Sequence, residues 1–120
     1  METFTIYPKK GEPFELRFRR FEFNELTGEV VLYDDHQTIL GVLMRPHLAA
    51  IAPSELHQTQ RRDMLTFTVL LREHLARPLT LNANAYVRDP GFDFIVDNRP
   101  LSWVYVDPAE ILAITYRPTN

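Results

Sequence analysis

The chain contains no cysteine among its 120 residues. This absence excludes disulfides, thiolate zinc sites, iron–sulfur ligation and thiol catalysis, and it fits a reducing compartment, so we expect a cytoplasmic protein. Long apolar runs are also missing. No stretch approaches the roughly 20 residues of a membrane-spanning helix, and the N-terminal residues lack the apolar core of a signal peptide. We therefore expect no membrane partner.

An excess of positive charge is the second thing the sequence lacks. The chain has 13 basic and 16 acidic residues, and its net charge is −3. A protein that binds nucleic acid through phosphates needs a local or global positive field, so nucleic acid is not the expected partner. Hydrophobic residues make up 45% of the chain, which is enough to build a core.

Alternation of apolar and polar residues dominates what is present and predicts an all-β fold. The segment from residue 13 to 24 reads PFELRFRRFEFN, in which the pair Arg19-Arg20 adds one residue to the alternation. A β-bulge would absorb the extra residue and keep the aromatic side chains on one face. The sequence therefore predicts a bulge there, with four buried phenylalanines: Phe14, Phe18, Phe21 and Phe23.

Further strands are expected at residues 29–33, 38–44, 48–52, 79–87, 91–96, 101–106 and 111–116. Residues 34–37 and 97–100 have the composition of tight hairpin turns. Residues 45–47 and 107–110 interrupt the strands and fit single 3₁₀ turns. Residues 66–77 fit either a strand or a helix that ends at Pro78.

The chain resembles itself at an offset of 63 residues. Eight positions are then identical and pair in order: Thr3, Phe4, Thr5, Leu16, Gly28, Asp34, Ala50 and Ile51 with Thr66, Phe67, Thr68, Leu79, Gly91, Asp97, Ala113 and Ile114. The similar pairs preserve strand phase and turn position together, which is typical of a tandem duplication. The alternative is that β proteins resemble themselves at strand spacing. The repeat favours the strand for residues 66–77.

The repeat predicts two small five-stranded, barrel-like units. The first unit spans residues 1–53, a connector spans residues 54–65, and the second unit spans residues 66–120, and the two can pack as one domain. Within the connector, Leu56, Gln60 and Met64 form one helical stripe, which allows a short connecting helix between Ser54 and Met64.

One short run resembles a known motif. Gly28 to Asp34 is similar to the opening of the first Sm motif, and Gly91 to Asp97 has the same spacing. The resemblance implies a small barrel that binds RNA. It covers seven residues in each half, and Thr38 and Leu101 stand where Sm proteins carry an RNA-contacting asparagine. The arginine–glycine step of the second Sm motif is absent, so the chain is not assigned to this family.

Candidate binding residues are basic or aromatic. Seven are singled out: Arg19, Arg20, Arg61, Arg62, Arg99, Trp103 and Tyr105. Trp103 and Tyr105 lie on one face of their expected strand, and such side chains are favoured anchors for protein contacts. The alternative is that Trp103 fills the core opposite Phe92 or Phe94.

The sequence marks no catalytic, cofactor or metal site. Asp34, Asp35 and His36 offer possible metal ligands, but a further convergent ligand is missing, and aspartates are ordinary residues of tight turns. No enzyme is therefore expected. We expect a non-enzymatic protein-binding or scaffold module that associates with itself. The alternatives are an Sm-like RNA-binding protein and, third, a small metal-dependent enzyme.

Overall fold

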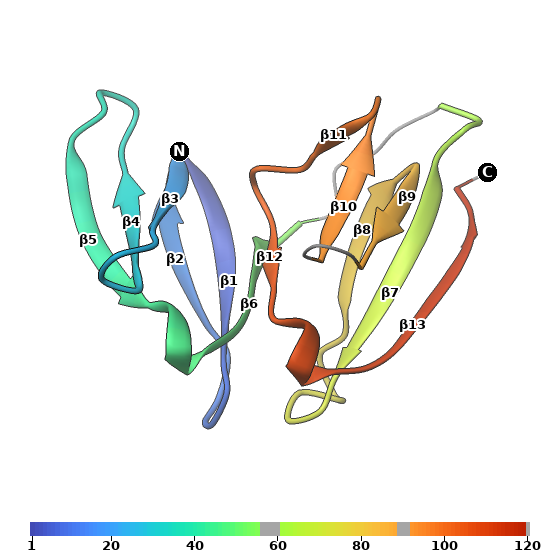
Figure 1. Ribbon diagram of the computed structural model, residues 1–120, viewed down its shortest axis with the longest axis horizontal. Coiled ribbons are helices and arrows are strands. Elements are labelled where there is room, and N and C mark those ends of the chain that lie inside the picture. Colours follow the sequence, from blue (N-terminus) through green and yellow to red (C-terminus); the bar gives the residue numbers. More distant parts are fainter. Residues whose placement is uncertain (56–60, 89–91, 120) are drawn as a thin grey trace.

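The structure is a computed structural model that describes residues 1–55, 61–88 and 92–119. It is all-β, with two single-turn 3₁₀ helices, η1 (Arg45–His47) and η2 (Pro108–Glu110). The strands are β1 (Glu2–Pro8), β2 (Phe14–Phe18), β3 (Arg20–Asn24), β4 (Glu29–Tyr33), β5 (Ile39–Met44), β6 (Leu48–Pro53), β7 (Leu65–Leu71), β8 (Leu79–Ala83), β9 (Ala85–Val87), β10 (Asp93–Val96), β11 (Arg99–Pro100), β12 (Tyr105–Val106) and β13 (Ile111–Pro118). Figure 1 shows the two halves of the chain side by side: the first half contains β1 to β6, and the second half contains β7 to β13. No helix in the described residues is long and apolar enough to cross a membrane.

In the first half, the extra residue at Arg19 separates two sheets. β2 pairs with β1 as far as Phe18, and β3 pairs with β4 from Arg20 onward. Between them, the Arg19 amide donates to the Tyr33 carbonyl at 2.7 Å. The predicted bulge is therefore replaced by a change of partner strand, which lets the chain turn from one sheet into the next.

Two of the four phenylalanines predicted to be buried are buried. Phe18 and Phe21 face the core, and the ring centroids of Phe4 and Phe18 lie 4.1 Å apart. The prediction is wrong for Phe14, which is 43% exposed. Phe14 is the first residue of β2, which lies at the edge of its sheet among the described strands. Phe23 is half-buried against the core of the first half.

In the second half, β7 pairs with β8 and β13, and β10 pairs with β9 and β11. Residues 65–71 form a strand, so the strand alternative for this segment is confirmed as far as Leu71. The described parts of the connector, residues 54–55 and 61–64, are not helical, and residues 56–60 lie outside the described residues. The hairpin turn at Asp97 and Asn98 has positive φ angles of 53° and 65°, the geometry that this residue pair favours.

The β1–β6 and β7–β13 pairings share one register. Thr5 pairs with Ala52, and Thr68, 63 residues later, pairs with Thr115. Both ladders shift register where β6 and β13 begin. Beyond the shift, the Lys9 amide donates to the His47 carbonyl, and the corresponding amide of Arg72 donates to the Glu110 carbonyl.

The sheets have three or four strands, and they are not closed into barrels. Residues 101–106 were predicted to form a strand of the second unit, but only Tyr105 and Val106 are in a strand, β12. β12 pairs with β6 of the first half, and the Asp107 amide donates to the Ala49 carbonyl at 2.8 Å. The segment thus leaves its own half to extend the sheet of the other.

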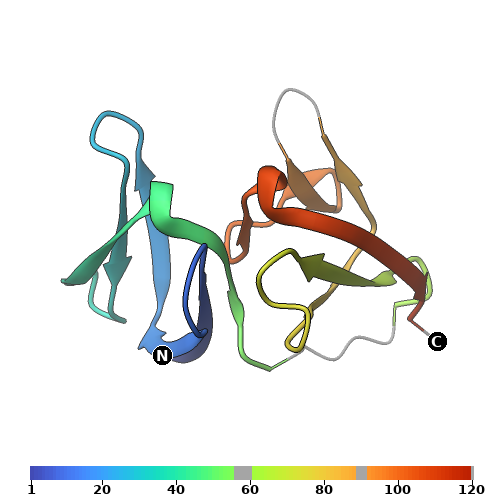
Figure 2. The ribbon, with the colours of Figure 1, turned by 90° about the horizontal axis from the view of Figure 1, so that it is seen from below.

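Strand β6 is buried on both faces because its side chains belong to two hydrophobic cores. Figure 2 shows this strand, in green, between the two halves. Its larger side chains, Leu48 and Ile51, belong to the core of the first half. Its alanines Ala49, Ala50 and Ala52 belong to the core of the second half. Small side chains allow a close approach, so the sequence of β6 fits a strand against which both halves pack.

Candidate functional site

The segment from Leu101 to Val106 carries the junction between the halves. Trp103 and Tyr105 pack against the core of the first half, whereas Val104 packs against that of the second. The two faces predicted for this segment therefore contact the two cores, one face each. Trp103 is half-buried at this junction, and it does not belong to the core that contains Phe92 and Phe94.

Three of the predicted site residues line one cavity. Arg19, Arg20 and Trp103 surround a space of about 480 Å³ together with Glu2, Phe4 and Ser102. The Arg20 guanidinium lies 4.0 Å from the ring centroid of Tyr33 and is 2.6 Å from Glu22 and from Gln37. The charge of Arg20 is therefore already balanced, and Arg19 is the more exposed of the two arginines.

Tyr105, the other predicted aromatic residue, contacts Phe23 and Arg45. The rings of Phe23 and Tyr105 are 5.2 Å apart, and the Arg45 guanidinium lies 4.7 and 5.4 Å from their centroids. The guanidinium also donates two 3.2 Å hydrogen bonds to the Glu25 carboxylate. A cation stacked on two rings from different halves holds those halves together.

The ionisation states at this contact are stable near neutral pH. Burial raises the pKa of Tyr105, although Arg45 opposes the shift. Partial burial alone would lower the pKa of Arg45, but hydrogen bonding to Tyr105 and the charge of Glu25 outweigh it and raise the pKa. Arg45 stays charged and Tyr105 stays neutral, so neither is poised for proton transfer.

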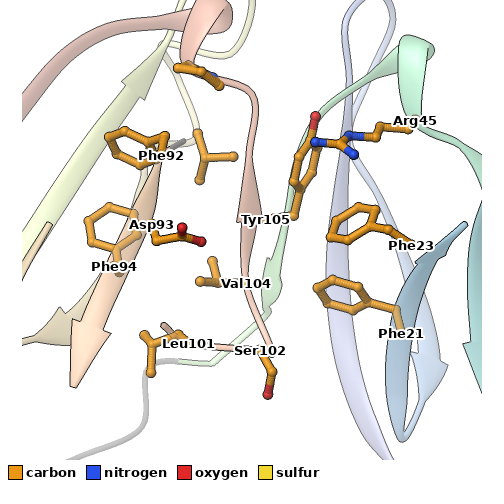
Figure 3. A pocket seen from close by; sticks show the side chains of 12 residues that line it. Phe21, Phe23, Arg45, Phe92, Asp93, Phe94, Leu101, Ser102, Val104 and Tyr105 are labelled. Carbon is orange, nitrogen blue, oxygen red and sulfur yellow. The ribbon is translucent and has the colours of Figure 1, made fainter. Parts of the chain in front are cut away.

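An aromatic cavity of about 460 Å³ lies at this junction. Figure 3 shows Phe21, Phe23 and Arg45 on the first-half side and Phe92, Phe94 and Leu101 on the other, with Tyr105 between them. Such a cavity suits a flat apolar group or a cation. However, Arg45 already covers the rings of Phe23 and Tyr105. We therefore interpret this cavity as part of the contact between the halves.

The cavity that Arg19 lines does not include the other predicted arginines, Arg61, Arg62 and Arg99, among its described lining residues. Arg61 forms ion pairs with Asp63 and Asp97, both at 2.7 Å, and thereby ties the connector to the turn after β10. These hydrogen bonds to Arg61 lower the pKa values of both carboxyls. Arg62 and Arg99 are exposed.

The acidic residues after β4 stabilise a tight turn by hydrogen bonds to its backbone. The Asp34 carboxylate accepts hydrogen bonds from the amides of His36 and Thr38, both at 2.8 Å, and the Thr38 bond is the main cause of its lowered pKa. Asp35 contacts the N-terminal amine. No group of three or more possible metal ligands converges in the part of the chain that the structure describes.

An exposed apolar row on strand β5 was not predicted. β5 is an edge strand, and four of its side chains are between 44% and 60% exposed: Ile39, Leu40, Val42 and Met44. Figure 1 shows β5 on the outer side of the first half, away from the second half. One signal could have indicated it, because the run ILGVLM has no polar residue to mark a solvent face.

Protein interiors and interfaces accept such an apolar strand, whereas an isolated exposed row of this kind is uncommon on a monomer.

Comparisons with protein-family models, with curated proteins and with solved structures found no match for this chain.

Proposed function

We propose that this protein is a non-enzymatic protein-binding or scaffold module that associates with itself through β5. The observation that carries the proposal is the row of exposed side chains at Leu40, Val42 and Met44, on a strand whose outer side pairs with none of the described strands. Exposed strand edges recognise proteins by adding a strand, with main-chain hydrogen bonds giving affinity and side chains giving specificity.

Three other edge strands, β2, β13 and β8, differ from β5 in ways that discourage pairing. β2 carries Glu15 and Arg17, and β13 carries Arg117 and Pro118. β8 is largely buried. Charged residues, prolines and coverage are the usual protection of sheet edges. β5 has none of the three, which supports its role as a contact surface.

We also propose that the two halves are copies of one barrel-like β unit, spanning residues 1–53 and 66–120 around a connector. The shared register at an offset of 63 supports this, as does the equivalent placement of η1 before β6 and of η2 before β13. The second copy has no described counterpart of the exposed β5 edge, because residues 101–104 are not in a strand and β12 pairs with β6.

The proposal predicts that Val42→Lys weakens association. Burying Val42 from each of two copies contributes about 3 kcal/mol, so the substitution should raise the dissociation constant by about a hundredfold. Light scattering over a range of concentrations measures the mass. Leu26→Lys is the matched control, because Leu26 is fully exposed in a turn. Equal masses for both variants and the unmodified protein would refute the role of β5.

Sm-like RNA binding is a second candidate function, favoured by one observation. Arg19, Arg20 and Trp103 share a cavity, and aromatic and arginine side chains together can bind single-stranded bases. The net charge of −3 and the ion pair of Arg20 with Glu22 weigh against it. A salt-sensitive mobility shift of single-stranded RNA at physiological salt would favour this candidate.

A further inference from the structure

We propose that the β5 edges of two copies of this chain pair antiparallel about a twofold axis at Val42, joining their three-stranded sheets into one. This inference rests on the proposed function and specifies its partner and register.

The hydrogen-bonding pattern identifies which backbone amides and carbonyls of β5 point away from β4. The Arg45 amide donates to the Gly28 carbonyl at 2.9 Å, in line with the register that pairs Met44 with Glu29. Hydrogen-bonded pairs alternate along an antiparallel ladder, so Leu43 and Gly41 also point their polar groups at β4. The amides and carbonyls of Val42 and Met44 therefore point to the open edge, where no described strand pairs with them.

The exposed side chains complement themselves in this register. A twofold axis at Val42 sets Val42 opposite Val42 of the partner subunit and Leu40 opposite Met44 of the partner subunit. Both cross-strand pairs in the row are then apolar, and the free backbone groups of Val42 meet those of Val42 of the partner subunit as a hydrogen-bonded pair. A shift of one residue would lose both the apolar pairs and the hydrogen bonds. It would set backbone groups that point to the open edge opposite groups that point to β4.

The charges at the two ends of β5 favour the antiparallel direction. The acidic turn with Asp34 and Asp35 precedes the strand, and Arg45 follows it. A parallel arrangement would set the two acidic turns side by side, which is repulsive. The antiparallel arrangement separates the two acidic turns by the length of the strand.

The absence of cysteine from the chain allows a direct test of the register. In a hydrogen-bonded antiparallel pair the Cα atoms are about 5.5 Å apart, within the range that a disulfide spans. We expect Val42→Cys to form a disulfide-linked dimer on mild oxidation with diamide. A mixture of Leu40→Cys and Met44→Cys should crosslink, whereas Leu40→Cys alone should crosslink at least tenfold more slowly. Leu26→Cys is the control for random collision.

The outcomes separate this inference from the proposed function. Crosslinking of Val42→Cys and of the mixed pair, well above that of Leu26→Cys, supports the register. A protein that associates through Val42 by light scattering, yet fails to crosslink in this pattern, overturns the register and leaves the proposed function standing. A protein that is monomeric at every concentration overturns both.

Discussion

Phe18→Ala is expected to lower the free energy of unfolding by roughly 3–5 kcal/mol. Phe18 is fully buried, and its ring contacts both Phe4 and Phe21 at centroid distances of 4.1 and 6.2 Å. Removing the ring leaves a cavity where the sheets on either side of Arg19 meet. The chain is held there by the β1–β2 ladder before Arg19 and by the β3–β4 ladder after it, so it cannot easily collapse to fill the cavity. Urea denaturation followed by fluorescence measures the change.

Phe14→Ala is the matched control, because it removes the same side chain from the same strand. Phe14 is 43% exposed, so we expect its loss to cost at most about 1 kcal/mol. Equal costs for the two substitutions would contradict the placement of the core. A loss of less than about 1 kcal/mol for Phe18→Ala would do so as well.

His74→Ala is expected to cost roughly 2–4 kcal/mol, because it removes both a buried ring and a partly buried hydrogen bond. His74 is 5% exposed, and its Nε2 lies 2.5 Å from the Pro8 carbonyl oxygen of the first half. Its ring also packs edge-on against Tyr7 at 5.5 Å. Thermal unfolding measures the loss, and His36→Ala, in an exposed turn, is the control.

His74→Phe separates the two contributions. It keeps a ring against Tyr7 but leaves the Pro8 carbonyl without its partner, so about 1–3 kcal/mol should still be lost. Unfolding of the His74→Phe variant with the stability of the unmodified protein would mean that the hydrogen bond between the halves contributes nothing.

Much of the local structure could be predicted because it depends on neighbouring residues. Alternation locates most strands, and aspartate-rich turns locate both hairpins. The bend at Arg19-Arg20 was also marked by the sequence, although a change of partner strand, rather than a bulge, accommodates the extra residue. A bulge and a change of partner strand would both keep Phe18 and Phe21 in one core.

The candidate site depends on contacts between residues that are far apart in the sequence, and such contacts leave weaker signals in the sequence. Nothing near Tyr105 in the sequence indicates that β12 pairs with β6, more than 50 residues earlier. Arg61 looks like a free basic residue until the fold brings Asp97 to it. The apolar run of β5 is the same whether the strand is buried in a core or exposed for a partner. Function therefore remains a proposal that stands on the exposure of β5.

Amide hydrogen exchange of Val42 and Met44, measured against protein concentration, tests most directly whether another copy covers β5. We predict that both amides exchange slowly at high concentration and lose their protection on dilution, as the paired edge opens. The amides of Glu15 and Arg17 on the charged edge strand β2 should exchange rapidly throughout. Rapid exchange of Val42 and Met44 at every concentration would contradict the account.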